Sequence, residues 1–189
     1  MSSDTKHGWA VSGILAACLI WAGSFAAMKL VLIADMSVGA MLTIRFVLGT
    51  LVLAGLVAIK RIPLQRRAIL DGICLGIPLL AVYWLQADGL RFTTTSKSGF
   101  ITGLYVIFTP LVSLLLGYRF KVAHALGALV AVLGLFLLVR DPRAPLGGWN
   151  RGDFETLLCA VACGFHIVLT GKFARRSNGW LLALFQVGT

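Results

Sequence analysis

The sequence predicts an all-α integral membrane protein, and three observations support this fold class. Of its 189 residues, 59% are hydrophobic and only 13% are charged, whereas about 25% of the residues in a soluble domain are charged. The mean hydropathy is +0.92. The apolar residues also occur in long blocks instead of amphipathic stripes, so the medium that suits them is a lipid bilayer.

Apolar blocks of about 17 to 25 residues are typical of membrane-spanning helices. Six complete spans are predicted, at residues 9–32, 37–59, 69–85, 98–117, 122–139 and 154–171. A seventh opens at Trp180 and reaches the last residue, Thr189. Only the Pro- and Gly-rich stretch 140–152 reads as a linker. The other connections are short, so neighbouring helices must run antiparallel.

Lysine and arginine are distributed unequally between the two ends of these spans. Of the 17 basic residues, ten lie on the side of the membrane that holds the N-terminus, called here the first side. They are Lys6, Lys60, Arg61, Arg66, Arg67, Arg119, Lys121, Lys172, Arg175 and Arg176. The second side has five: Arg91, Lys97, Arg140, Arg143 and Arg151. Because cytoplasmic loops carry the excess of Lys and Arg, the N-terminus is predicted to be cytoplasmic. The net charge of +10 then reflects topology and attraction to anionic lipids, and no nucleic-acid partner is predicted.

The predicted location is the cell membrane, as a multi-pass protein of a bacterial inner membrane. Residues 15–18 (LAAC) match the lipobox at which bacterial lipoproteins are cleaved. Apolar sequence continues after it through Leu32, however, which favours an uncleaved signal-anchor helix.

Two segments of the chain resemble each other. Residues 14–29 (ILAACLIWAGSFAAMK) and 156–171 (TLLCAVACGFHIVLTG) are both runs of small and apolar residues with an aromatic residue near the middle. Five spans lie between the two starts, so the second copy enters from the opposite face of the membrane. Such inverted repeats are typical of secondary transporters, whose substrate site lies near the midplane between the halves. The predicted units are 1–139 (first repeat), 140–152 (linker) and 153–189 (start of the second repeat).

Several stretches resemble the EamA-type family of the drug/metabolite transporter superfamily. They are WAGSFAAMK at 21–29, Arg45-Phe46, GLRFTTTSKSGFITGLYVIFTPLVSLLLG at 89–117, LGALVAVLGLFLLV at 126–139 and GDFETLLCAVACGFHIVLTGKFARR at 152–176. The resemblance covers essentially the whole chain, and 89–117 is its most specific part. In one departure, Gly117-Tyr118-Arg119 stands where many members carry Gly-Glu.

This resemblance implies ten helices in two inverted five-helix repeats, with the N-terminus in the cytoplasm. It also implies export or exchange of small metabolites, often amino acids or related compounds, through a central cavity. By this comparison the chain is expected to be truncated, with one five-helix unit and the start of a second. The expected partners are a small-molecule substrate and membrane lipids, and a homodimer is left open.

Two basic residues are candidates for the substrate pathway. Arg45 lies eight residues into its span, about 12 Å from the outer end, where a charge requires a cavity or a partner. The alternative for Arg45 is a structural ion pair with Asp88 or Asp35. Lys97 lies at the outer interface, where it would either extend to water or help a helix N-terminus to bind an anion.

Aromatic residues supply the predicted cavity walls. Trp21 and Tyr105 lie too deep for an interfacial aromatic belt, and with Ser24 they are predicted to line the cavity. Trp84 is a further candidate. Pro110 removes a backbone hydrogen bond in mid-span and predicts a helix kink.

Small residues predict where helices approach closely. Gly72 with Gly76, and Gly99 with Gly103, form two G-x-x-x-G pairs, which permit close contact between helices.

Enzymatic and cofactor chemistry finds little support. No nucleotide-binding loop, nucleophile–base pair or zinc motif is present. Cys159, Cys163 and His166 share a helix face that could hold a soft metal, but no fourth ligand is evident, so no metal or cofactor is expected. The only glutamate is Glu155 at a membrane edge, which disfavours proton coupling through a core carboxylate. A membrane-embedded enzyme is therefore disfavoured, and a non-transporting assembly module is the other alternative.

Overall fold

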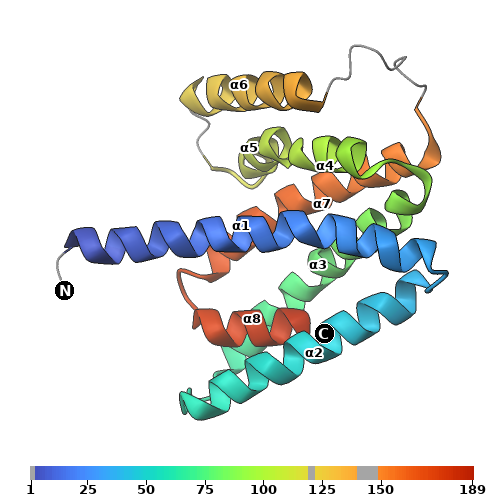
Figure 1. The fold of residues 1–189 in the computed structure, drawn as a ribbon. Coiled ribbons are helices and arrows are strands. Elements are labelled where there is room, and N and C mark those ends of the chain that lie inside the picture. The colour runs from blue at the N-terminus through green and yellow to red at the C-terminus, as the bar shows by residue number, and fades with distance from the viewer. Residues whose placement is uncertain (1–2, 119–121, 140–148) are drawn as a thin grey trace.

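In the computed structural model, the described residues are 3–118, 122–139 and 149–189, and all regular elements within them are helices (Figure 1). The helices are α1 (Ser3–Ile33), α2 (Val38–Ile59), α3 (Arg66–Phe92), α4 (Thr95–Gly103), α5 (Tyr105–Leu115), α6 (Val122–Val139), α7 (Arg151–Phe173) and α8 (Gly179–Val187). The predicted all-α class is therefore confirmed.

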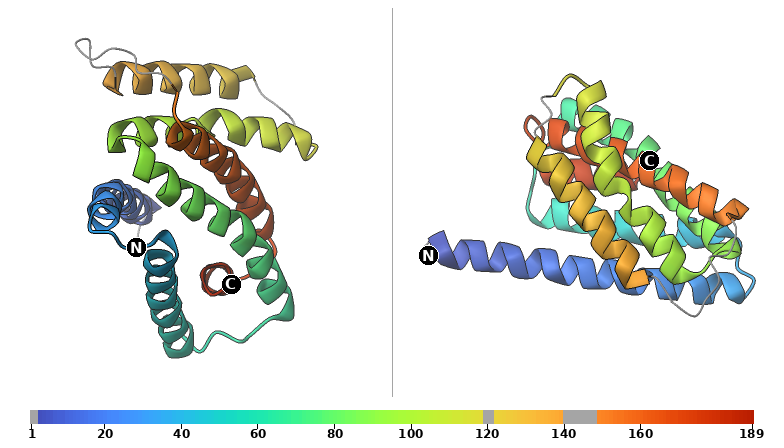
Figure 2. Two further views of the ribbon diagram at one scale, coloured as in Figure 1. Left: turned by 90° about the vertical axis from the view of Figure 1, so that its right-hand side faces the viewer. Right: turned by 90° about the horizontal axis from the view of Figure 1, so that it is seen from above.

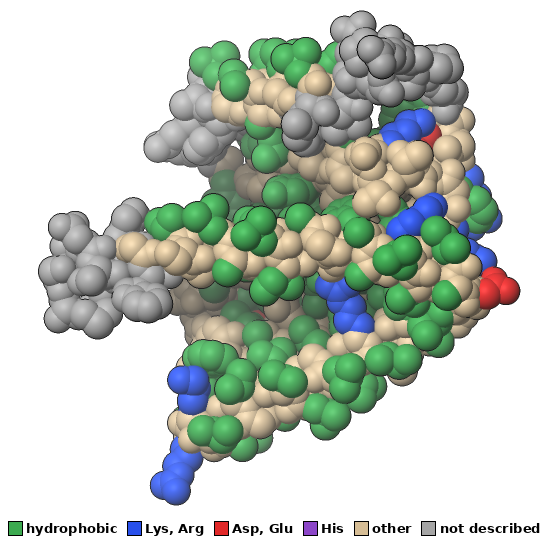
Figure 3. All heavy atoms as spheres, in the orientation of Figure 1, with side chains coloured by type: hydrophobic (Ala, Val, Ile, Leu, Met, Phe, Trp, Pro, Cys, Tyr) green, Lys and Arg blue, Asp and Glu red, His purple; other side chains and the backbone are tan. Residues whose placement is uncertain are grey.

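Five stretches among the described residues are long and apolar enough to cross a membrane: Val11–Ile33, Val38–Ile59, Arg66–Phe92, Thr95–Leu115 and Arg151–Phe173. Each overlaps a span predicted from the sequence. The helix α6 has the predicted bounds but is not among these five. Apolar side chains cover much of the outward surface of α1, α2 and α6 (Figure 3), as expected for helices that face lipid.

The helices alternate in direction, so their connections gather at two ends of the bundle (Figure 1). One end, called here the basic end, holds the α2–α3 connection (60–65) and the α7–α8 connection (174–178). The opposite end, called the linker end, holds the α1–α2 connection (34–37), the α3–α4 connection (93–94) and the start of α7. The predicted antiparallel arrangement thus brings residues of the more basic loops together at one end.

The centre of the bundle is the pair α3 and α7, which pack along each other (Figure 2). The helices α4 and α5 pack against α7, and α6 lies outside them. The short α8 packs against α3 and α2, whereas α1 makes its main backbone approaches to α3 and α4. Figure 2 shows α1 running along one side of this assembly.

Glycines allow backbones to approach within the central pair. A Cβ atom placed on Gly152 of α7 would lie 2.3 Å from the carbonyl oxygen of Gly89 in α3. The reciprocal Cβ on Gly89 would lie 2.8 Å from the Gly152 oxygen. Because both obstacles are backbone atoms, neither position can hold a larger residue without separating the two helices.

The two predicted glycine pairs behave differently. A Cβ on Gly72 would lie 2.5 Å from the Phe185 Cβ, and one on Gly76 would lie 3.0 Å from the Thr189 Cβ. The first pair therefore lets the chain at α8 approach α3 closely, as predicted. A Cβ on Gly99 would meet nothing within 4 Å among the described residues, so close contact through the second pair is not confirmed.

The predicted span 98–117 is interrupted at Leu104, between α4 and α5. The Leu104 N–H donates to the Ile101 oxygen at 3.1 Å, and the Ile107 N–H donates to the Leu104 oxygen at 2.8 Å. These three-residue steps tighten the helix into a 3₁₀-like turn, next to Gly103, a poor helix former. Pro110 lies six residues further on, inside α5, and its own kink stays a prediction.

Candidate functional site

A cavity of about 340 Å³ lies between α1, α4 and α5, and is called here the α1–α4–α5 cavity. Its lining residues are Cys18, Trp21, Ala22, Phe25, Thr95, Gly99, Thr102, Gly103 and Tyr105. The ring centroids of Trp21 and Tyr105 are 6.3 Å apart. The structure therefore brings two of the predicted wall residues together, although 84 positions separate them in the sequence.

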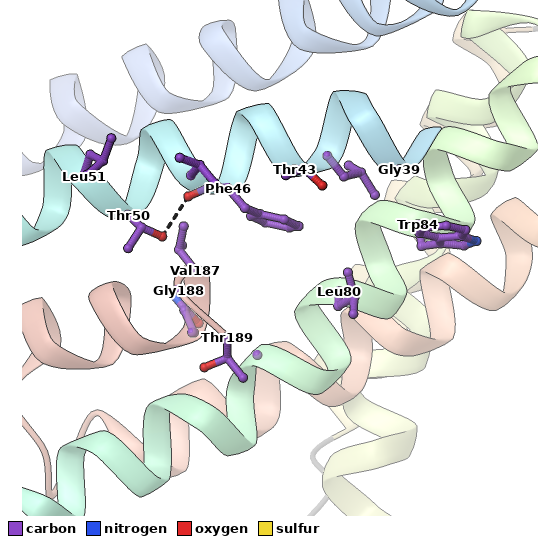
Figure 4. A pocket seen from close by; sticks show the side chains of 14 residues that line it. Gly39, Thr43, Phe46, Thr50, Leu51, Leu80, Trp84, Val187, Gly188 and Thr189 are labelled. Carbon is purple, nitrogen blue, oxygen red and sulfur yellow. Dashed lines mark hydrogen bonds between the residues drawn. The ribbon is translucent and has the colours of Figure 1, made fainter. Parts of the chain in front are cut away.

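A second cavity, of about 420 Å³, lies between α2, α3 and the end of α8. Its lining residues are Gly39, Leu42, Thr43, Phe46, Val47, Thr50, Leu51, Gly76, Leu80, Trp84, Gln186, Val187, Gly188 and Thr189. Figure 4 shows side chains of α2 and α3 on opposite sides of it, with residues 187–189 at one edge. Trp84 belongs to this cavity, so the structure does not place it beside Trp21.

Arg45 lies against an aromatic ring. Its Cζ is 4.4 Å from the centroid of the Tyr83 ring, and its Nη2 donates a long hydrogen bond of 3.4 Å to the Tyr83 hydroxyl. Phe46 packs edge-on against the same ring, with centroids 5.5 Å apart. A cation over an aromatic face is stabilised by about 0.5–2 kcal/mol, which offsets part of the cost of this half-buried charge.

The ion pairs proposed as alternatives for Arg45 do not occur among the described residues. Asp88 instead pairs with Arg151 at 2.9 Å and with Arg91 at 3.7 Å, and Asp35 lies in the α1–α2 connection with a φ of 67°. Arg45 lines neither cavity, but its neighbour Phe46 lines the second, and its partner Tyr83 packs on the same apolar cluster as Phe25 of the first.

Lys97 is bound to an aspartate that the sequence analysis did not single out. Its Nζ donates to Asp153 Oδ2 at 2.6 Å, and the Asp153 side chain is fully buried. The Thr93 hydroxyl donates to Asp153 Oδ1 at 2.7 Å, and the Asn150 N–H donates to Oδ2 at 2.9 Å. In this structure a protein carboxylate binds the ammonium group, while the Lys97 side chain stays 36% exposed.

The same aspartate starts α7. The Asn150 side chain accepts from the Asp153 N–H at 3.0 Å, which completes a capping box. Such a box satisfies two of the unpaired N–H groups at a helix start. The spacing Asn-x-x-Asp was visible in the sequence and would have placed the start of α7 at Arg151 instead of residue 154.

A second lysine within a span, Lys29, binds the end of α3. Its Nζ donates to the carbonyl oxygens of Leu90 at 2.5 Å and Thr93 at 3.0 Å. Carbonyls at a helix C-terminus lack helical partners and favour a cation. This contact ties the end of α1 to the linker end of α3.

At the basic end, Asp71 of α3 binds the α7–α8 connection. Arg176 donates to both carboxylate oxygens of Asp71, with Nε at 2.9 Å from Oδ2. The Ser177 hydroxyl donates to Oδ2 at 2.7 Å. The hydrogen bond with Asp71 raises the pKa of Arg176, so the guanidinium stays charged at physiological pH.

Two other features singled out in the sequence are Ser24 and the group Cys159, Cys163 and His166. The Ser24 hydroxyl donates to the Trp21 carbonyl oxygen of its own helix at 2.6 Å, and Ser24 is absent from the lining of both cavities. On α7, His166 Nε2 is 3.0 Å from Gln186 Oε1, while Cys159 and Cys163 pack with Val82. Within the described ranges no group of three or more metal-ligating side chains is found.

Comparison with known proteins identifies the family to which these helices belong. Residues 8–140 match the EamA-like transporter family. The chain is a member of that family. A curated protein of Archaeoglobus fulgidus, named "Uncharacterized transporter", is 32% identical over 187 residues, which are 98% of this chain and 56% of the relative. The chain thus spans about half the length of that relative. No solved structure matches the sequence.

Proposed function

We propose that this EamA-like membrane protein is a secondary transporter that exports or exchanges a small metabolite by alternating access. The observation that carries the proposal is the α1–α4–α5 cavity, where Trp21 and Tyr105 converge within apolar helices. Secondary transporters bind their substrates within the membrane-spanning region, and ligand sites are mostly apolar cavities of about 300–1,000 Å³. Amino acids and related compounds are the substrates that the family resemblance favours.

Ion pairs at both ends of the α3–α7 pair support alternating access. At the linker end, Lys97 of α4 binds Asp153 of α7. At the basic end, Arg176 of the α7–α8 connection binds Asp71 of α3. A transporter that opens to one side at a time must break contacts at one end while keeping those at the other. We propose that these two pairs are such contacts.

The predicted pathway residues then take different roles. Trp21 and Tyr105 form the walls of the cavity, with Ser24 one turn from Trp21, and Arg45 is proposed to act on the pathway beside it through Tyr83. Lys97 closes the linker end, and Trp84 belongs to the second cavity. Pro110 is proposed to kink α5 near the cavity. We propose that the basic end and the N-terminus face the cytoplasm, because cytoplasmic loops carry the excess of Lys and Arg, and that the membrane is a bacterial inner membrane.

The test measures metabolite efflux, and resistance to toxic metabolite analogues, in cells that express the protein from its complete gene. We expect Trp21→Ala and Arg45→Ala to reduce transport by about tenfold or more, equivalent to at least about 1.4 kcal/mol. Lys97→Ala should reduce it less. Trp149→Ala is the matched control, because that side chain is 70% exposed. If a stably inserted Trp21→Ala protein transports as the unaltered protein does, this cavity is not the substrate site.

A further inference from the structure

Three polar side chains are buried without hydrogen-bond partners. Gln86, Ser98 and Thr102 are 1%, 0% and 2% exposed. Within the part of the chain that the structure describes, both amide atoms of Gln86 and the Ser98 hydroxyl have no partner, and the Thr102 hydroxyl has at most a weak contact with the Cys159 thiol. One oxygen of Glu155 and the hydroxyl of the less buried Thr170 are also unpaired. Buried polar groups in native proteins are nearly always paired with protein, water or ligand. We call these three residues the polar recess, and they require partners of that kind.

The position of Gln86 follows from the packing of α3 on α7. On α3 it lies between Val82 and Gly89, at spacings that put all three on one face. Gly89 faces Thr156, because a Cβ there would lie 2.9 Å from the Thr156 hydroxyl oxygen. Val82 packs with Cys159. Gln86 therefore faces α7 between the levels of Thr156 and Cys159.

The two hydroxyls reach the same level from α4. Thr102 lies beside the Cys159 thiol, and Ser98 precedes Thr102 by one helical turn on the same face. The polar recess is thus the junction of α3, α4 and α7. Thr102 is also a lining residue of the α1–α4–α5 cavity, so the recess adjoins that cavity.

The remaining walls of the cavity are apolar or neutral. Trp21, Phe25 and Tyr105 supply aromatic rings, and none of the described lining residues carries a charged side chain. A charged ligand group would lose its hydration here without gaining a counter-ion from this lining, which is unfavourable. A pure hydrocarbon would leave Thr102 and the groups behind it unpaired.

We propose that the α1–α4–α5 cavity binds a small uncharged aromatic compound whose polar group both donates and accepts hydrogen bonds. The aromatic part packs against Trp21, Phe25 and Tyr105. The Thr102 hydroxyl, which is buried in this structure, turns toward the polar group of the ligand, and water that enters with the ligand links this group to Ser98 and Gln86. This inference rests on the proposed function, since it names the substrate class of the same cavity, and it narrows that class to uncharged compounds in place of zwitterionic amino acids.

The test uses four probes of nearly identical shape: benzamide, acetophenone, benzoate and benzamidine. Acetophenone lacks the donor of benzamide, and the other two carry a negative or a positive charge. Binding to the purified protein in lipid nanodiscs is followed by quenching of tryptophan fluorescence, with Trp21→Phe to identify the signal from the cavity. We expect benzamide to bind about tenfold more tightly than acetophenone, which is the effect of one hydrogen bond between neutral groups. We expect benzoate and benzamidine to bind about tenfold more weakly than benzamide as well, because their charges would lose hydration in the cavity.

Near-isosteric variants test the polar recess itself. Thr102→Val and Gln86→Leu should each abolish the preference for benzamide over acetophenone and leave acetophenone binding nearly unchanged. Ser98→Ala removes a single hydroxyl and should reduce the preference only partly, which keeps the test informative if a larger change prevents folding. Thr43→Val is the matched control, because Thr43 lines the second cavity and should leave the preference intact.

The inference is overturned if benzoate or benzamidine binds more tightly than benzamide, if no probe binds, or if Thr102→Val keeps the preference. These results differ from failure of the proposed function. Trp21-dependent efflux of a charged metabolite would uphold transport and overturn this substrate class. Selective benzamide binding in a protein that moves no metabolite in cells would support the substrate class and overturn the transport proposal.

Discussion

The two ends of the α3–α7 pair are each closed by an aspartate and a cation, yet they are built differently. Burial does not distinguish them: the side chains of Asp153 and Asp71 are 0% and 7% exposed, and those of their partners Lys97 and Arg176 are both 36% exposed. The difference lies in the tasks of the two carboxylates and in the geometry of the two cations.

At the linker end, one carboxylate has two tasks. Asp153 caps the start of its own helix through Asn150 and also binds Thr93 and Lys97 from other parts of the chain. At the basic end, Asp71 is the sixth residue of α3 and takes no part in capping. It binds Arg176 through two hydrogen bonds and Ser177 through a third. Opening the linker end therefore disturbs the start of α7, whereas opening the basic end moves only a connection. We expect the basic end to open more readily.

The largest contrast is expected from removing each carboxylate. Asp153→Ala should lower the free energy of unfolding by about 2–4 kcal/mol, because it removes the hydrogen bonds of a buried carboxylate and also a helix cap worth about 0.5–2 kcal/mol. Asp71→Ala should cost only about 1–2 kcal/mol, since it removes hydrogen bonds but no cap. Denaturant unfolding in mixed micelles measures both. Equal losses would contradict the proposed difference between the ends.

Backbone contact at the linker end gives a second, smaller effect. Gly152→Ala should cost about 1–3 kcal/mol by overpacking, because the new Cβ would meet the Gly89 oxygen. Gly171→Ala on the same helix is the control. A Cβ there meets nothing within 4 Å, so this change should gain about 0.5–1 kcal/mol through helix propensity. A harmless Gly152→Ala would show that α3 and α7 separate easily at this end.

The geometry of the cation at the basic end predicts a smaller loss. Arg176→Lys keeps the charge but loses the two-pronged guanidinium contact, which should cost about 1 kcal/mol. The same substitution at exposed Arg175 should leave the unfolding midpoint unchanged. If the two variants behave alike, the contact with Asp71 acts as a simple charge pair.

Labelling of single introduced cysteines tests which end of the bundle faces the cytoplasm. These substitutions should have little effect on the free energy of unfolding. Arg66→Cys and Trp149→Cys place thiols at the basic end and before the start of α7, in a background where exposed Cys18 and Cys74 are replaced by serine. A membrane-impermeant maleimide should label position 66 only from the cytoplasmic side and position 149 only from outside. Labelling of both from one side would rule out the predicted topology.

Hydropathy predicted α2 to within one residue but misplaced the starts of α1, α4 and α7 and both ends of α3. The predicted span 37–59 became α2, which begins after its N-cap Ser37. The predicted span 69–85 became α3, which continues to Phe92. Its last turns hold Gln86, Asp88 and Arg91, which a hydropathy reading assigns to a loop. Contacts with protein hold two of them in the helix: Gln86 is buried and Asp88 pairs with Arg151.

The sequence predicted less of the candidate site than of the helices. The depth of Trp21 and Tyr105 predicted their convergence, because aromatic residues far from the interface need an interior partner. The partner of Lys97 lies 56 residues away, and that of Arg176 lies 105 residues away. Such pairings depend on how helices pack, which local patterns do not contain. The polar recess was missed for the same reason, since isolated Ser, Thr and Gln residues within apolar spans give no local signal.

The contact between Lys29 and the end of α3 has a consequence for the order of assembly. Its acceptors at Leu90 and Thr93 lie 61 and 64 residues further along the chain. At about 5–20 residues per second of synthesis, the first acceptor follows Lys29 by about 3–12 s. During that interval the ammonium group must be accommodated by water, lipid headgroups or the insertion machinery. The end of α1 therefore reaches its final position only after α3 has been completed.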